Sequence, residues 1–128
     1  MTLLDASLLI DFLRAKALPL FAQMQSAGGA VCGITRAEIL SGARGPADRT
    51  KLVTILGGFQ QVAIPDPMWG EVGDVQARLR ASGLTIPLAD AVLTTVALAL
   101  DIEIWARDIH YQAAQQIFPS LKLYQESP

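Results

Sequence analysis

Short apolar runs alternate with helix-like segments along all 128 residues, and this alternation restricts the possible folds more than any other feature. We expect strands over residues 2–4, 30–34, 61–64, 102–106 and 121–124. Apolar spacing and Gly or Pro breaks predict helices over residues 8–14, 18–26, 35–43, 47–56, 68–81, 87–100 and 110–117. Such alternation is typical of a mainly parallel sheet covered on both faces. The sequence therefore predicts a three-layer α/β/α sandwich in one domain, residues 1–128.

The apolar content is high for a monomer of this size, at 52% hydrophobic residues and a mean hydropathy of +0.37. Surplus apolar surface favours a dimer or a partner chain, with residues 52–56 and 68–69 as candidate contact surfaces. Cys32 is the single cysteine, within an apolar run, and we expect it to be buried. We recognise no signal peptide and no membrane-spanning run, so the expected location is the cytoplasm.

Acidic residues follow three of the predicted elements at the same edge of the sheet. Asp5 ends the first strand, Asp108 follows the strand over 102–106, and Glu38 lies one turn into the helix after the second strand. Asp90 lies one turn inside a helix that begins near Pro87. Ligands of open α/β sheets bind at the carboxyl ends of the strands. We therefore expect these four carboxylates to line one pocket.

Each acid also has a purely structural interpretation. Asp5, or Ser7, can cap the first helix. Glu38 can be a solvated position on an amphipathic helix, and Asp90 can complement the positive end of its helix dipole. Asp108 can cap the last helix or pair with Arg107. Taken singly, none of the four acids distinguishes a functional site from these alternatives.

The four acids together are more informative. Asp5 and Asp90 both lie in apolar segments, where a buried carboxylate is costly unless it is paired or bound to metal. Clustered carboxylates repel one another unless a divalent cation neutralises them. Because no His-rich or Cys-rich cluster is visible, an all-oxygen site for Mg²⁺ or Mn²⁺ is favoured. The net charge is −2, and setting aside four acids as metal ligands leaves +2, which is compatible with a nucleic-acid substrate.

Four segments resemble, in order, the signature segments of PIN-domain proteins, and the likeness is greatest to the VapC toxins of toxin–antitoxin pairs. They are LLDAS (3–7), TRAEILSG (35–42), LADA (88–91) and WARDIHY (105–111). The resemblance implies a Mg²⁺- or Mn²⁺-dependent endoribonuclease, a homodimer held inactive by a cognate antitoxin. It assigns the metal site to Asp5, Glu38, Asp90 and Asp108, with Ser7 supporting Asp5. One departure is Ala106, where the family often has Thr or Ser, and it puts the number of metal ions in doubt.

The resemblance leads to a mechanistic hypothesis. One or two metal ions activate a water for attack on an RNA phosphodiester, with Glu38 or Asp90 assisting as general base. Arg36, Arg44 and Arg107 are candidate phosphate contacts, although each can equally be an exposed, solubilising arginine.

The remaining aromatic and histidine residues give weaker signals. His110 is the single histidine, and a surface position on the last helix is favoured over a role as general acid. Trp69 and Trp105 can stack on bases, but for Trp105 core packing is favoured because it lies in an apolar strand.

Two other functions compete with the nuclease. A non-catalytic binding module can use the same fold with vestigial acids, but the presence of all four acids favours an enzyme. A metal-dependent phosphatase usually carries an Asp-x-Asp triplet at a strand end, where this chain has Asp5-Ala6-Ser7.

Overall fold

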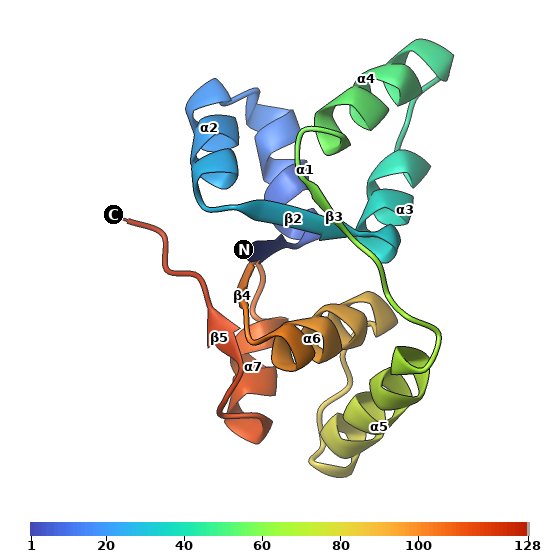
Figure 1. Ribbon diagram of the computed structural model, residues 1–128, viewed down its shortest axis with the longest axis vertical. Helices are drawn as coiled ribbons and strands as arrows, with labels where there is room; N and C mark the ends of the chain where they lie inside the picture. The colour runs from blue at the N-terminus through green and yellow to red at the C-terminus, as the bar shows by residue number, and fades with distance from the viewer. Residues whose placement is uncertain (128) are drawn as a thin grey trace.

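The computed structural model describes residues 1–127, over which the chain forms seven helices and one five-stranded sheet (Figure 1). The strands are β1 (Thr2–Leu4), β2 (Gly29–Cys32), β3 (Gln60–Val62), β4 (Glu103–Trp105) and β5 (Lys122–Leu123). The helices are α1 (Ala6–Ala15), α2 (Leu18–Ser26), α3 (Gly33–Ser41), α4 (Pro46–Leu56), α5 (Met68–Ala81), α6 (Leu88–Leu100) and α7 (His110–Ile117).

The strands lie in the order β3-β2-β1-β4-β5, and each neighbouring pair in the described part of the chain is parallel. In the register, Leu3 lies opposite Ala30 of β2, and Leu4 lies opposite Trp105 of β4. Because the pairs are parallel, the carboxyl ends of the strands share one edge. The chain segments that leave β1, β2 and β4 therefore start side by side, which is the arrangement that the acid positions require.

Successive strand residues point to opposite faces of the sheet and into two separate cores. Leu4, Val31 and Trp105 pack into the core formed with α1–α4, whereas Leu3, Cys32 and Ile104 pack into the core formed with α5–α7. Figure 1 shows α1–α4 on one side of the sheet and α5–α7 on the other. The predicted α/β fold and its three layers are confirmed, as is the burial of Cys32.

All twelve predicted elements are present in the described residues; four have the predicted bounds, and the others differ by one or two residues at an end. Helix α1 begins at Ala6 rather than Leu8 because the Asp5 carboxylate caps it, accepting a hydrogen bond from the Ser7 backbone N–H at 2.9 Å. The second strand ends at Cys32, since α3 already begins at Gly33. The interval 68–81 is the helix α5, as predicted.

The candidate contact surface over residues 52–56 is partly wrong. Leu52 and Leu56 are buried in the core beside α3, and Val53 is the large apolar side chain of this helix that stays exposed. Trp69, in the other candidate surface, is exposed. No helix among residues 1–127 is long and apolar enough to cross a membrane.

Candidate metal centre

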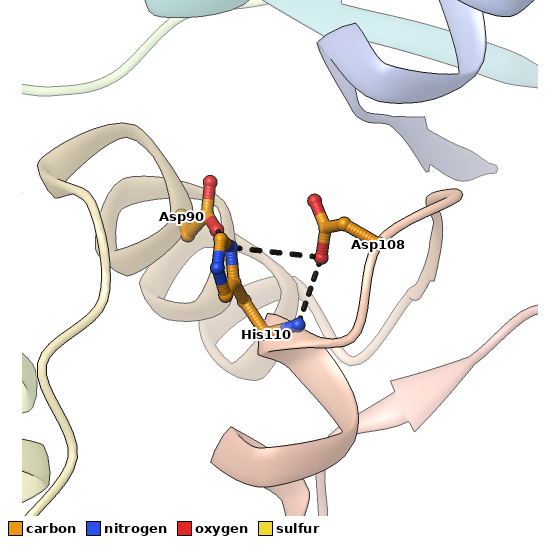
Figure 2. Close-up of side chains that lie close together, drawn as sticks. All are labelled: Asp90, Asp108 and His110. Carbon is orange, nitrogen blue, oxygen red and sulfur yellow. Dashed lines mark hydrogen bonds and ion pairs between the residues drawn. The ribbon is translucent and has the colours of Figure 1, made fainter.

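Three of the predicted acids meet at the carboxyl edge of the sheet. Asp5 directly follows β1, and Asp108 lies in the turn after the neighbouring strand β4. Asp90 occupies the first turn of α6, and its carboxylate lies beside that of Asp108 (Figure 2). Asp5 and Asp90 are buried, with 4% and 7% of their surface exposed. Buried carboxylates are uncommon without a partner or a cation, so this edge is chemically unusual.

His110 joins the two aspartates in one compact cluster. Its Nδ1 lies 2.6 Å from Asp90 Oδ2 and 3.8 Å from Asp108 Oδ1. The His110 backbone N–H also donates to Asp108 Oδ1 at 2.9 Å, which fixes the start of α7 (Figure 2). One potential metal ligand from each of the three residues lies within 4.8 Å of the others. His110 thus lies at the start of the last helix with 42% of its side chain exposed, as predicted, but its ring also contacts Asp90. The expected all-oxygen site therefore has an imidazole nitrogen beside it.

Asp5 is held by hydrogen bonds to both of its carboxylate oxygens. Ser7 donates to Oδ2 through its backbone N–H at 2.9 Å and its hydroxyl at 2.5 Å. The Tyr111 hydroxyl donates to Oδ1 at 2.6 Å. Asp5 is thus a helix cap and a member of the acidic site at once, and the two sequence interpretations are compatible. The Ser7 hydroxyl also accepts from the Arg107 backbone N–H at 2.9 Å, which ties the ends of β1 and β4 together.

Burial, and to a lesser extent the charge of neighbouring acids, makes the carboxyl groups of Asp90 and Asp108 harder to ionise. Burial raises the pKa of Asp90 from 3.8 to about 6, the charges of Asp5 and Asp108 add to the shift, and His110 opposes it. The pKa of Asp108 is raised first by burial and then by Asp5. Burial and the same Asp5 charge raise the pKa of Tyr111, so its hydroxyl stays protonated and donates. The charge of Asp5 therefore acts on every one of these groups.

Glu38 lies at the rim of the site rather than in the compact cluster. It is on α3 and is exposed to solvent. Its pKa is nevertheless raised, by partial desolvation and by the charge of Asp5. Glu38 therefore shares the electrostatic field of the site while its carboxylate stays accessible.

The three arginines predicted to contact substrate have different surroundings. Arg36 Nη1 donates to Gln61 Oε1 at 2.8 Å. The Arg44 side chain is 91% exposed and lies 3.9 Å from Asp48. The Arg107 guanidinium pairs with carboxylates other than that of Asp108.

Arg107 reaches away from the cluster toward the C-terminal segment. Its Nη2 lies 2.6 Å from Glu126 Oε1, and its Nη1 lies 3.4 Å from Asp11 Oδ2. The suggested pairing of Arg107 with Asp108 is therefore wrong. Two carboxylates already pair with this guanidinium, so it is a weaker candidate for a phosphate contact than Arg36 or Arg44.

A polar hollow of about 300 Å³ opens beside Asp108, between α7 and the C-terminal segment. Ala106, Tyr111 and Gln112 are among the residues that line it. The methyl group of Ala106 thus stands in the wall of the hollow, where a threonine or serine would add a hydroxyl.

Trp105 points to the opposite face of β4. It is 2% exposed and stacked on Tyr124 with ring centroids 4.1 Å apart, which confirms its predicted place in the core.

The arrangement fits a hard divalent cation. Asp5, Asp90 and Asp108 offer carboxylate oxygens, the ligands that Mg²⁺ and Mn²⁺ prefer. Burial first, and the charges of neighbouring acids second, raise the pKa values of Asp90 and Asp108, and a bound cation would oppose both effects.

No protein-family model matches the sequence, and no curated protein matches it. Solved structures do match. A chain of VapBC-1 from nontypeable Haemophilus influenzae is similar with a TM-score of 0.77 at 16% identity, covering 96% of each chain. A chain of VapBC2 from Rickettsia felis, bound to a promoter DNA fragment, gives 0.76 at 15% identity and the same coverage. FitAcB from Neisseria gonorrhoeae gives 0.74 at 19%, covering 98% of this chain and 97% of that one.

At these identities the comparison concerns the fold. The chain has the PIN-domain fold of these toxin–antitoxin proteins, over nearly its full length and nearly theirs. The fold that the four sequence segments imply is therefore confirmed. What the site does has to be argued from its own residues.

Proposed function

We propose that the protein is a Mg²⁺- or Mn²⁺-dependent endoribonuclease and the toxin of a toxin–antitoxin pair. The observation that carries the proposal lies at the carboxyl edge of a PIN-type sheet. There Asp90 and Asp108 lie in one cluster and the charge of Asp5 acts on both, with Asp5 and Asp90 buried. Clustered, partly buried carboxylates destabilise the folded protein when no cation is bound. Such clusters are typical of functional sites, and cation binding would explain this one.

The residues that would hold the cation are Asp5, Asp90 and Asp108, with Glu38 at the rim. When bound, Mg²⁺ or Mn²⁺ supplies Lewis-acid chemistry, lowering the pKa of water and offsetting charge on a phosphodiester in its transition state. Ser7 and Tyr111 orient Asp5 by hydrogen-bonding both of its oxygens. This preorganisation reduces the rearrangement needed when charge develops in the reaction.

Glu38 is the best-placed general base. Its carboxylate is exposed, and its raised pKa brings it closer to the neutral range at which proton transfer is efficient. In the proposed step Glu38 takes the proton of the attacking water, a new phosphorus–oxygen bond forms, and the bond to the leaving ribose oxygen breaks. The leaving oxygen takes up a proton from solvent water and becomes a hydroxyl group. Asp90 is less free for this task, since His110 Nδ1 occupies its Oδ2.

The partners follow from the same proposal. Single-stranded RNA would contact Arg36 and Arg44 through its phosphates, with Arg107 contributing only after release from its two carboxylate partners. The antitoxin would be a second protein that covers the site, and a homodimer would cover apolar surface such as Val53. The toxin would act in the cytoplasm, where its RNA substrates are.

The proposal is tested with purified protein, free of antitoxin, and total cellular RNA in Mg²⁺, in Mn²⁺ and in EDTA. We expect cleavage that EDTA abolishes and that the variants Asp5→Asn and Asp90→Asn lose at least a hundredfold. Asp74→Asn, an exposed change on α5, is the matched control and should leave cleavage unchanged. Failure of the folded wild-type protein to cleave in either metal would refute the nuclease and favour a binding module.

A further inference from the structure

A second hollow, of about 370 Å³, lies at the carboxyl ends of β2 and β3. We call it the Trp69 hollow, and the residues that matter to its chemistry are Gly33, Ile34, Arg36, Val62, Ile64 and Trp69. Its walls are mostly apolar, with one cation and one large aromatic ring. This combination differs from the acidic centre and calls for a separate explanation.

The aromatic wall is unusual because the chain leaves it exposed. The sequence has two tryptophans, and Trp105 is buried at 2% exposure in stacking contact with Tyr124. Trp69, in the first turn of α5, is 43% exposed beside the hollow. An exposed indole ring offers a flat face on which a planar ligand can stack.

The Arg36 guanidinium, which is the positive charge in the hollow, is held in place by hydrogen bonds. Gln61 donates through Nε2 to the backbone carbonyls of Leu56 and Phe59 at 3.0 and 2.9 Å, which directs its Oε1 toward Arg36. Arg36 Nη1 donates to that oxygen at 2.8 Å. A Cβ at Gly33 would lie 3.3 Å from Arg36 Nη2, so the glycine leaves room for the guanidinium. Arg36 thus presents fixed N–H donors, the form in which arginine binds phosphate best.

The Trp69 hollow also lies on the same edge as the acidic site. Strands β3, β2 and β1 are adjacent and parallel, and neighbouring strands are about 4.8 Å apart. The end of β3 is therefore roughly 10 Å from the end of β1, where Asp5 lies. An extended nucleic-acid strand with a phosphate at the acidic site can reach the hollow with the next one or two nucleotides.

We infer that the Trp69 hollow is a nucleotide subsite, in which a base of single-stranded RNA stacks on Trp69 and a neighbouring phosphate pairs with Arg36. The inference rests on the proposed function and adds a place for the RNA beside the scissile bond. Stacking tolerates every base because each has a flat face, so the subsite gives affinity with little sequence preference. Purines, with the larger faces, bind it better than pyrimidines.

The experiment measures the binding of a labelled single-stranded RNA octamer by fluorescence anisotropy in EDTA, so that affinity is read without cleavage. Trp69→Ala is expected to raise Kd by about 5- to 100-fold, the range seen when a stacked aromatic is removed. Trp69→Phe keeps a flat ring and should stay within a few-fold of wild type. Leu100→Ala is the control, because Leu100 is similarly exposed, at 46%, at the far end of α6.

A spectroscopic signature accompanies the affinity change. RNA should quench the tryptophan fluorescence of the wild-type protein, and Trp69→Phe should lose that quenching while still binding RNA. Unchanged affinity in Trp69→Ala would overturn the inference, as would a wild-type protein that binds no RNA. A third outcome would also overturn it: a wild-type protein that sediments as a dimer and a Trp69→Ala protein that sediments as a monomer but binds RNA normally. The hollow would then be an interface between copies of the chain.

The two proposals fail in different ways. A wild-type protein that binds RNA through Trp69 but cleaves nothing in Mg²⁺ or Mn²⁺ would keep the subsite and refute the nuclease. Cleavage and binding that are both indifferent to Trp69→Ala would keep the nuclease and refute the subsite.

Discussion

Replacing Asp90 by asparagine should stabilise the metal-free protein while abolishing its activity. Asp90 has 9% of its side chain exposed, and its pKa is raised from 3.8 to about 6. Each unit of pKa shift corresponds to about 1.4 kcal/mol, so keeping Asp90 ionised in the folded protein costs at most about 3 kcal/mol at pH 7.5. Solvent screening and the weakened bond to His110 reduce the expected gain of Asp90→Asn to about 1–2 kcal/mol.

The sign of the pH dependence follows from the direction of the shift. Because the folded protein holds the Asp90 proton more tightly than the unfolded chain, this contribution to stability is fully present below pH 4 and is lost as pH rises through about 6. The difference between Asp90→Asn and wild type should therefore be small near pH 4 and largest above pH 7.

The assay is thermal unfolding in EDTA at a series of pH values. At pH 7.5 the midpoint of Asp90→Asn should lie roughly 3–8 °C above wild type, for a domain of this size. Millimolar Mg²⁺ should reduce the difference between the two unfolding midpoints, because the cation stabilises the folded wild-type protein that binds it. Asp74→Asn should behave as wild type throughout. Two results would refute the reasoning. One is an Asp90→Asn protein no more stable than wild type in EDTA; the other is a difference in unfolding midpoint between the two proteins that Mg²⁺ leaves unchanged.

Two further variants test how the site and the sheet are built. Tyr111→Phe removes the hydroxyl that orients Asp5 and should weaken Mn²⁺ binding roughly tenfold by calorimetric titration without unfolding the protein, whereas an unchanged Kd would contradict that role. Gly29→Ala places a Cβ 2.7 Å from the Met24 carbonyl oxygen and should cost about 1–3 kcal/mol in urea unfolding, whereas Gly70→Ala, with open space around it, should cost nothing. Equal unfolding midpoints for the two glycine variants would contradict this prediction, because the backbone would then have moved to make room for the new Cβ beside the Met24 carbonyl without loss of stability.

The fold was predictable because local pattern and layer structure coincide in this chain. The central strands β1 and β2 are short apolar runs whose alternate residues pack into two cores, as Leu3 and Leu4 do in β1. Boundaries were less predictable, because caps decide them. Asp5 extends α1 backward through a side-chain hydrogen bond that apolar periodicity does not record.

The positions of Asp5 and Asp108 just after parallel strands could be predicted from the sequence, but the contacts that these carboxylates make could not. The Tyr111–Asp5 bond joins residues 106 apart in sequence, and the His110–Asp90 bond joins residues 20 apart. A signal for His110 existed in its spacing, two residues after Asp108 at the start of a helix. A lone histidine with that spacing is also compatible with a surface position without a side-chain partner. The contact of His110 with Asp90 is therefore visible only in the structure.

The proposed reaction is hydrolysis of an RNA phosphodiester bond by water, at a site where Asp5, Asp90 and Asp108 would hold the metal ion. The most direct test incubates a defined RNA with the protein and Mn²⁺ in ¹⁸O-labelled water and determines the new ends by mass spectrometry. Attack by water should place one ¹⁸O in a linear terminal phosphate and give no cyclic phosphate, with no product in EDTA or with Asp5→Asn. A 2′,3′-cyclic phosphate end, or cleavage that persists in EDTA, would contradict it, because the ribose hydroxyl rather than water would then be the nucleophile.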